Sequence, residues 1–240
     1  MQRRQEKAKK HKERQKEAEI RRRIALRGRI PFAEFMQIAL YHRAGGYYSR
    51  GASGASGDYF TSSATHPVFG ALLAVQAERA WEVMGKPHPF HVVEMGAGDG
   101  RMASDFVRYS HGLSQGFAKA LTYVAIDRRR AVPSTASPSE SHHSILADGV
   151  PMNGITGLFI SNELLDAFPV HRFQVRSGRS LELFVALDPS GTLVEQPGES
   201  STHLIDERLS QIGDGLHEGF VGEVNLGIGP WMQQVSRSAR

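Results

Sequence analysis

The chain has 240 residues, of which 40% are hydrophobic, and a formal net charge of +4. A chain of this length forms one large domain, or one domain with appendages, and can bury a sizeable core. It contains no cysteine, which excludes disulfide bonds, thiolate catalysis and cysteine-ligated zinc, and we expect no metal site.

The basic charge is concentrated at the N-terminus. Residues 1–29 hold 13 Lys or Arg and 4 Glu, a net charge of +9, whereas the rest of the chain holds 16 basic and 21 acidic residues, a net charge of −5. Residues 2–19 contain almost no large apolar side chain, so we predict a basic arm over 1–29 that is helical or disordered. Such an arm can bind nucleic acid or another acidic surface, but its composition favours a solvated extension.

No segment has the pattern of a membrane span or an export signal. No apolar run approaches the roughly 20 residues of a transmembrane helix, and no charged region followed by an apolar run marks a secretory signal. A mitochondrial presequence fits poorly, because the arm has four glutamates and no serine. We therefore expect a cytoplasmic protein without membrane insertion, with the mitochondrial matrix as the less favoured location.

Between residues 30 and 90 the sequence predicts a helical and loop subdomain. After Pro31, apolar residues recur at the spacing of one helix face through Leu40. A glycine- and serine-rich loop covers residues 51–57. Residues 70–84 (GALLAVQAERAWEVM) form a second amphipathic helix, which ends at Gly85.

A glycine-rich turn follows the first predicted strand. Residues 91–95 read HVVEM and lead into Gly96, Gly98 and Gly100, after which a helical pattern begins at once. The glycines let the backbone turn sharply and approach a ligand without Cβ atoms in the way. With Glu94 two residues before the first glycine, the pattern resembles motif I of class I methyltransferases, which bind S-adenosylmethionine (SAM). The alternative is an ordinary strand-to-helix turn that is rich in glycine.

Three more strands are predicted downstream. They are residues 121–126 (LTYVAI), a short strand near 145–147 and residues 157–161 (GLFIS), with a Pro/Ser loop at 133–144 between the first two. Strands that alternate with helices predict an α/β fold with a parallel, doubly wound sheet. We assign residues 91–240 to this domain, with a hairpin-like insertion at about 172–195. A ligand is then expected at the carboxyl ends of the strands.

Acidic residues end two of these strands. Asp127 follows the second strand, where a carboxylate can accept hydrogen bonds from both hydroxyls of a ribose. Asp148 follows the third strand, where its side chain or the neighbouring backbone can meet the edge of an adenine. Each residue taken alone can equally be a helix cap or a surface acid. Together with Glu94, they place acids at three successive strand ends, which favours one binding site.

Residues 161–169, SNELLDAFP, form a second polar segment at a strand end. Asn162, Glu163 and Asp166 leave the fourth strand together, and a helical turn that starts there puts both carboxylates on one side. Two carboxylates suit a guanidinium, whose planar fork they bind, and one of them can accept the proton that a methylated nitrogen loses. The alternative is equally supported: Asn162 caps a helix and the two acids occupy its first turn.

Five blocks of the sequence resemble the MidA-type SAM-dependent methyltransferases. They are IPFAEFMQIALYHRAGGYY (30–48), GDYFTSSATHPVFG (57–70), VVEMGAGDGR (92–101), SNELLDAFPVHRFQV (161–175) and EVNLGIGPWM (223–232). Their order and spacing agree over nearly the whole chain, and the second and fourth blocks are specific to this family. The family includes the mitochondrial assembly factor that methylates an arginine of a complex I subunit.

The resemblance implies a role for each matching residue. Glu163 and Asp166 match the segment beside the site of methyl transfer, and we predict that they are catalytic. The residues predicted to bind SAM are Thr61, Ser62, Glu94, Gly96, Gly98, Gly100, Asp127, Asp148 and Asn162. Of these, Thr61 and Ser62 match a loop that packs beside the cofactor in the family.

The sequence departs from the family pattern in two places. Ser63 and Ala64 stand where the family has a Pro-Glu pair after the Thr-Ser pair. This chain therefore has no side chain to perform the function of that glutamate. Family members also continue well beyond position 240, and fewer strands than a full class I sheet contains are identifiable. We therefore expect a sheet that is incomplete at its C-terminal side, in a chain that is a fragment or has compromised activity.

The resemblance implies a SAM-dependent methyltransferase that acts on an arginine of a protein partner, such as a respiratory complex subunit. A small-molecule acceptor is an alternative, because folds of this type host many acceptors. A second alternative is a truncated binding or assembly module without catalytic activity. Nucleic acid is a less favoured partner, and the sequence does not indicate an oligomeric state.

Overall fold

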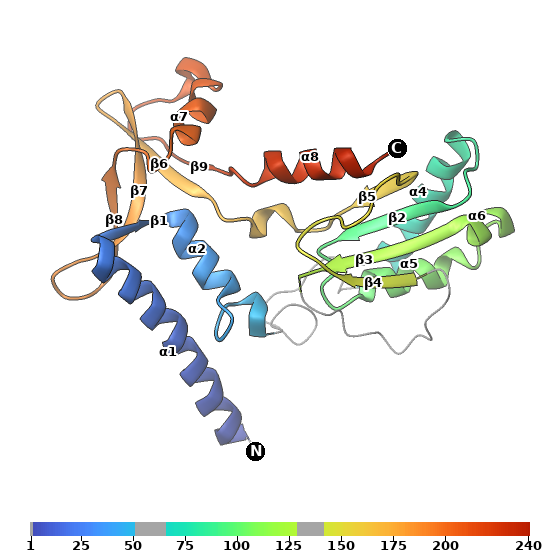
Figure 1. Cartoon of the computed structure of the whole chain (residues 1–240), viewed down its shortest axis with the longest axis horizontal. Helices are drawn as coiled ribbons and strands as arrows, with labels where there is room; N and C mark the ends of the chain where they lie inside the picture. The colour runs from blue at the N-terminus through green and yellow to red at the C-terminus, as the bar shows by residue number, and fades with distance from the viewer. Residues whose placement is uncertain (1, 51–65, 129–141) are drawn as a thin grey trace. The chain divides into compact units, whose positions relative to one another are not determined.

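The structure is a computed structural model that describes residues 2–50, 66–128 and 142–240 (Figure 1). The chain forms two compact units. The first combines residues 1–50 with 167–229, and the second combines residues 51–166 with 230–240. Within the described residues, no helix is both long enough and apolar enough to cross a membrane.

A four-stranded parallel sheet forms the centre of the second unit. Its strands are β2 (Phe90–Met95), β3 (Leu121–Asp127), β4 (His142–Leu146) and β5 (Gly157–Ile160), and they lie in the order β4-β3-β2-β5 (Figure 1). All neighbouring pairs are parallel, and Val92 lies opposite both Tyr123 and Leu158. Because a parallel sheet is covered on both faces, its central strands are apolar along nearly their whole length.

Helices pack on both faces of this sheet. On one face, α4 (Val68–Val83), α5 (Arg101–Ser110) and α6 (Gln115–Ala120) contribute Trp81, Phe106 and Phe117 to a core with Val92 and Tyr123. On the other face, α8 (Ile228–Ser238) contributes Trp231 and Val235 to a core with Val93 and Ile126. The predicted α/β architecture, a parallel sheet between helices, is confirmed.

One predicted boundary in this unit is wrong. The sequence predicts a loop through residue 144, but β4 begins at His142. Residues 142–144 pair in register with Tyr123–Ala125 of β3. They form a strand because β3 offers them backbone hydrogen bonds, whereas their own polar side chains, two of them exposed, carry little strand signal.

The first unit contains an antiparallel sheet. Its strands are β1 (Arg29–Pro31), β6 (His171–Arg176), β7 (Arg179–Leu187), β8 (Leu193–Gly198) and β9 (Val221–Val224). The long strand β7 pairs with β1, β6 and β8, and β6 pairs with β9. A tight turn at Ser177 and Gly178, both with positive φ angles, joins β6 to β7. The predicted hairpin-like segment is therefore present, and β8 extends it by one strand.

Helices of the first unit pack through short apolar stripes. Ile20 and Ile24 of α1 (Gln2–Arg27) are buried with Ile30, with Ile38 of α2 (Phe32–Tyr41) and with Val185 of β7. On α7 (His203–Ser210), two residues join a second core with β6 and β9. The N-terminal arm is thus helical, and its last turns carry the residues that pack.

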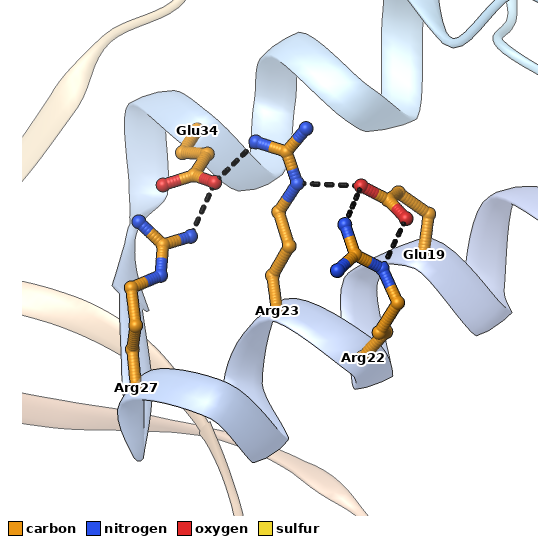
Figure 2. Close-up of polar contacts among 5 residues, drawn as sticks. All are labelled: Glu19, Arg22, Arg23, Arg27 and Glu34. Atoms are coloured by element: carbon orange, nitrogen blue, oxygen red, sulfur yellow. Dashed lines mark hydrogen bonds and ion pairs between the residues drawn. The ribbon is translucent and has the colours of Figure 1, made fainter.

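Charged side chains also join α1 to α2 (Figure 2). Glu34 accepts hydrogen bonds from Arg23 and Arg27, both at 2.5 Å, and Glu19 pairs with Arg22 and Arg23 within α1. Burial alone would raise the pKa of Glu34, but the hydrogen bonds from Arg27 and Arg23 outweigh it and lower the pKa. Because these pairs are partly exposed, we expect them to contribute less to stability than the apolar contacts beside them.

The two units divide the chain differently from the predicted domains. The sequence predicts boundaries after residues 29 and 90 and places the segment 172–195 inside the SAM-binding domain. In the structure, Ile30 of β1 pairs with Val185 of β7, so the hairpin belongs with the N-terminal helices. The pairing of β1 with β7 joins residues that are far apart in the sequence, and no local sequence pattern predicts it.

We expect Ile24→Ala to lower the free energy of unfolding by about 2–4 kcal/mol, because truncation of a buried apolar side chain leaves a cavity. Leu26→Ala in the same helix is the control. Leu26 is 70% exposed, and its truncation should change stability by less than about 0.5 kcal/mol. Denaturant unfolding measures both variants, and equally small effects would show that α1 does not pack on the rest of the first unit.

Candidate functional site

The carboxyl ends of four parallel strands meet at one edge of the sheet in the second unit. The chain passes from β2 outward to β3 and β4 and then returns to the other side of β2 with β5. In open α/β sheets, ligands bind in the crevice where the strand order reverses in this way. Asp127 is the last residue of β3, and the glycine turn, Asp148 and residues 162–166 follow the ends of β2, β4 and β5. The structure thus gathers at one edge those predicted residues of this unit that it describes.

The glycine turn has a backbone conformation that other residues avoid. Gly96, Gly98 and Gly100 have φ angles of 77°, 58° and 78°, in the left-handed region where a Cβ atom is unfavourable. The amides of Gly96 and Ala97 donate to the carbonyl oxygen of Ile126 in β3, at 2.9 and 3.1 Å. A Cβ atom added to Gly98 would meet no atom of the described residues within 4 Å. Among these residues, the turn therefore faces open space that a ligand can fill.

Asp127 holds this turn from the neighbouring strand. Its Oδ2 atom accepts a hydrogen bond from the amide of Gly98 at 2.9 Å. The residue is the last of β3 and is partly buried, at the strand end where the sequence predicts it. The bond to Gly98 gives Asp127 a structural task, and the contact with a ribose stays a prediction.

A buried acid lies immediately before the turn. Glu94 is 3% exposed, and its Oε2 atom accepts a hydrogen bond from the hydroxyl of Tyr123 at 2.8 Å. Burial raises the pKa of Glu94 to about 7; the bond from Tyr123 opposes this shift, and the negative charges of Asp127 and Asp99 add to it. Within the described residues, no Lys or Arg pairs with this carboxyl group. Glu94 is therefore close to the midpoint of its titration at neutral pH.

Tyr123 is the residue of this site that the sequence analysis missed. Side chains alternate between the two faces of a strand, so Glu94 shares a face of β2 with Val92. Tyr123, Ala125 and Asp127 share the matching face of β3. The sequence feature that could have identified Tyr123 is its position four residues before a strand-end acid, in a strand that is otherwise almost entirely apolar. Its pairing with Glu94 follows only from the register of the two strands.

Asp148 is far more exposed than Glu94. β4 ends at Leu146, and Asp148 lies in the turn beyond it with 78% of its side chain exposed. It forms an ion pair with Arg128, the residue that follows β3, at 2.6 Å. The pair links two neighbouring strand ends at the same edge of the sheet. The predicted contact of Asp148 with an adenine stays a prediction.

The segment after β5 does not form the predicted helical turn. Glu163 has a φ angle of 50°, which residues other than glycine rarely adopt, and the short 3₁₀ helix η2 (Leu165–Ala167) begins only afterwards. The expected helical spacing of Glu163 and Asp166 is therefore wrong, and so is the alternative in which Asn162 caps an α-helix. Both carboxylates are exposed. Backbone strain of this kind is concentrated at functional sites.

Leu164 joins this segment to the glycine turn. Its Cδ1 atom lies 2.9 Å from the position that a Cβ atom on Gly96 would occupy. A larger residue at position 96 would have to displace Leu164, so glycine serves here both for its positive φ angle and for close approach. The contact sets residues 162–166 directly beside the glycine turn.

The remaining predicted residues, Thr61 and Ser62, lie outside the described residues. Among residues 2–50, 66–128 and 142–240, no group of three or more His, Cys, Asp or Glu is arranged to hold a metal ion. The described site is thus a glycine turn with open space beside it, one buried acid, and several acids at its rim.

Sequence comparisons connect this site to known proteins. Residues 72–239 match the model of a family of S-adenosyl-L-methionine-dependent methyltransferases. The mitochondrial protein arginine methyltransferase NDUFAF7 of Danio rerio is 31% identical over 205 residues, which cover 73% of this chain and 46% of that protein. Its homologue in Drosophila melanogaster is 29% identical over 192 residues, which cover 70% and 44%. The chain spans less than half the length of these relatives.

Two crystal structures from Burkholderia thailandensis have the same fold. One, with bound S-adenosyl-homocysteine, superposes with a TM-score of 0.81 and 24% identity, and the match covers 97% of this chain and 61% of that one. The other, a native structure, gives a TM-score of 0.78 and 25% identity, with 97% and 60% covered.

We expect the stability of the chain to depend on pH through Glu94. Its folded-state pKa of about 7 lies above the ordinary value of 4.5, so its contribution is greatest below pH 4.5 and is lost as the pH rises through 7. Relative to Glu94→Gln, the wild-type free energy of unfolding should therefore fall by up to about 3 kcal/mol between pH 4.5 and pH 8.

Denaturant unfolding across this pH range tests the expectation. Glu82→Gln is the matched control, since the Glu82 side chain is 54% exposed on α4 and its loss should leave the pH dependence of the wild type unchanged. A wild-type curve that runs parallel to that of Glu94→Gln would show that Glu94 titrates normally.

Proposed function

This chain belongs to the family of S-adenosyl-L-methionine-dependent methyltransferases, and from that premise we propose that it methylates an arginine side chain of a partner protein. SAM is the cofactor of the family. The observation that carries the proposal is the contact of Leu164 with Gly96, which sets two exposed acids beside a glycine turn with open space next to it.

The glycine turn fits a nucleoside cofactor. Its left-handed glycines keep Cβ atoms away from the ligand, and Gly98 faces open space. In this proposal, the backbone of Gly96–Gly100 lies against the cofactor, Asp127 keeps the turn in shape, and Asp148 lies near the adenine. S-adenosyl-homocysteine is bound in the crystal structure of a protein with the same fold, which supports this use of the turn.

The exposed acids suit a cationic acceptor. When bound, SAM supplies a methyl group that is open to attack by a nucleophilic nitrogen. Glu163 and Asp166 would orient a guanidinium through charge-assisted hydrogen bonds, and one of them would accept the proton that the attacking nitrogen loses. Holding the acceptor in place supplies most of the rate enhancement in this scheme. The curated relatives are named as protein arginine methyltransferases, which supports an arginine of a protein as the acceptor.

The left-handed backbone at Glu163 supports a catalytic position for this residue. This conformation costs a glutamate about 1–2 kcal/mol relative to an ordinary one. The left-handed backbone also fixes the direction in which the side chain leaves it. A respiratory complex subunit as the partner and a cytoplasmic location remain proposals, and the curated relatives are named as mitochondrial proteins.

We expect Gly98→Ala to weaken SAM binding at least about tenfold, because its Cβ atom enters the space assigned to the cofactor. Gly85→Ala is the matched control: its φ angle is 81° and an added Cβ atom also meets no described residue within 4 Å, but Gly85 precedes β2 at the opposite end of that strand. Both variants should lose about 1–2 kcal/mol of stability from backbone strain. Calorimetry that finds equal SAM affinity in both would remove the turn from the cofactor site.

We expect Glu163→Gln to lower turnover about tenfold or more with unchanged affinity for SAM. Glu163→Gly should lower turnover at least as much while it raises stability, because glycine relieves the strain of the left-handed backbone. Glu82→Gln, which removes an exposed acid on α4, should leave turnover unchanged. Equal losses in SAM affinity and in turnover would place Glu163 on the cofactor instead of the acceptor.

Turnover is measured by the transfer of label from methyl-labelled SAM to a protein extract, which is then hydrolysed with acid, and in parallel to a metabolite extract. Label in methylarginine supports the proposal. Label in small molecules would establish the alternative of a small-molecule acceptor. Bound SAM without transfer to either would identify the chain as a binding or assembly module.

A further inference from the structure

We propose that Glu94, held in place by Tyr123, is the group that makes the cofactor site prefer SAM over its product, S-adenosylhomocysteine. This rests on the proposed function, because it assumes that the glycine turn binds SAM. In the transfer, the acceptor nitrogen forms a bond to the methyl carbon and later loses a proton, while the carbon–sulfur bond breaks and its electron pair stays on sulfur. The sulfonium thus becomes a neutral thioether, and the ligand that leaves carries one positive charge less than the one that binds.

The charges next to the turn favour a cationic ligand. The carboxyl group of Glu94 is buried, and its hydrogen-bond donor among the described residues is the neutral hydroxyl of Tyr123. Asp127 at the end of β3 and Asp99 within the turn add negative charge around it. Arg101 at the start of α5 pairs with Asp99, at 3.1 Å. A buried carboxylate without a cation is unfavourable, so a positive charge brought by the ligand stabilises its ionised form.

Tyr123 keeps the carboxyl group of Glu94 in one position. Its ring packs against Phe106 of α5, with 4.9 Å between the centroids, and edge-on against His142 of β4, with 5.9 Å. Burial lowers the pKa of His142, so this imidazole brings no positive charge to the site at neutral pH. The ring contacts hold the Tyr123 hydroxyl 2.8 Å from Glu94, and Tyr123 is therefore a positioning residue.

The preference should depend on pH in a defined direction. With a pKa of about 7, Glu94 is mostly neutral at pH 6 and mostly ionised at pH 8. An ionised Glu94 attracts the sulfonium and leaves the thioether nearly unaffected. The ratio of SAM affinity to S-adenosylhomocysteine affinity should therefore increase as the pH rises, which favours cofactor binding and product release together.

Calorimetric titration of the full chain with SAM and with S-adenosylhomocysteine, at pH 6 and at pH 8, tests the proposal. The amino groups of the ligands titrate differently as well, so the affinity ratio of Glu94→Gln serves as the baseline at each pH. Relative to this baseline, the wild-type ratio should increase up to about tenfold between the two pH values. Tyr123→Phe should move the midpoint of the increase to higher pH, because its hydroxyl stabilises the carboxylate.

Each outcome decides between the two proposals. Wild-type protein that binds both ligands, with a ratio that follows the Glu94→Gln baseline, would overturn the role of Glu94 and leave the cofactor site intact. Wild-type protein that binds neither ligand at either pH would overturn the cofactor site and, with it, this inference. If Glu94→Gln does not fold, the direction of the midpoint shift in Tyr123→Phe decides, and an unchanged midpoint would overturn the proposal.

Discussion

The end of β3 holds the glycine turn that follows β2, and the geometry of the site depends on this contact. The carbonyl oxygen of Ile126 accepts two amide hydrogen bonds from the turn, and the carboxylate of Asp127 accepts a third. Three bonds from one strand end can hold a left-handed backbone that would otherwise be unfavourable. The contact with Leu164 on one side and the start of α5 at Arg101 on the other both follow from this shape.

Two departures of the second unit from ordinary folding rules lie near these strand ends, and a third, the positive φ angle of Lys86, lies before β2 at the other end of that strand. The strands β2, β3 and β5 are mainly apolar and the helices pack on both faces of the sheet, so local preference and tertiary structure agree through most of the described part of the unit. The two near the strand ends are Glu94, an acid buried without a cation among the described residues, and Glu163, a glutamate in the left-handed region. Each of these features lowers the free energy of unfolding, and in natural proteins such unfavourable features are found mainly at functional sites. Their position at the carboxyl edge is the main physical argument for a site there.

The two units are built on different principles. The parallel sheet of the second unit is formed by one nearly continuous stretch of chain, whereas the first unit joins two distant stretches through β1 and β7. In the first unit, apolar contacts of Ile20 and Ile24 and the ion pairs of Glu34 fix α1 against α2 and the sheet. The segment of Glu163 and Asp166 ends the first of the two stretches of the second unit, and the chain enters the first unit at the next residue, Ala167.

Local sequence patterns determined the elements and the chemistry of the strand ends. The strands that lead into Gly96, Asp127 and Asn162 could be predicted because apolar residues, glycines and acids occur at fixed spacings. Parallel strands then bring their carboxyl ends to one edge of the sheet. The resemblance to a methyltransferase family depended on the same short blocks. For this reason the fold class and the cofactor could be predicted before the structure was known.

Only the tertiary structure decided which residues face one another. The pairing of Tyr123 with Glu94, the ion pair of Arg128 with Asp148 and the placement of β7 beside β1 all depend on strand register, which joins positions far apart in the sequence. The helical turn expected at Glu163 also failed for a tertiary reason. Beside it, Leu164 packs on Gly96 and into the core under α8, and this packing overrides the local preference for a helix.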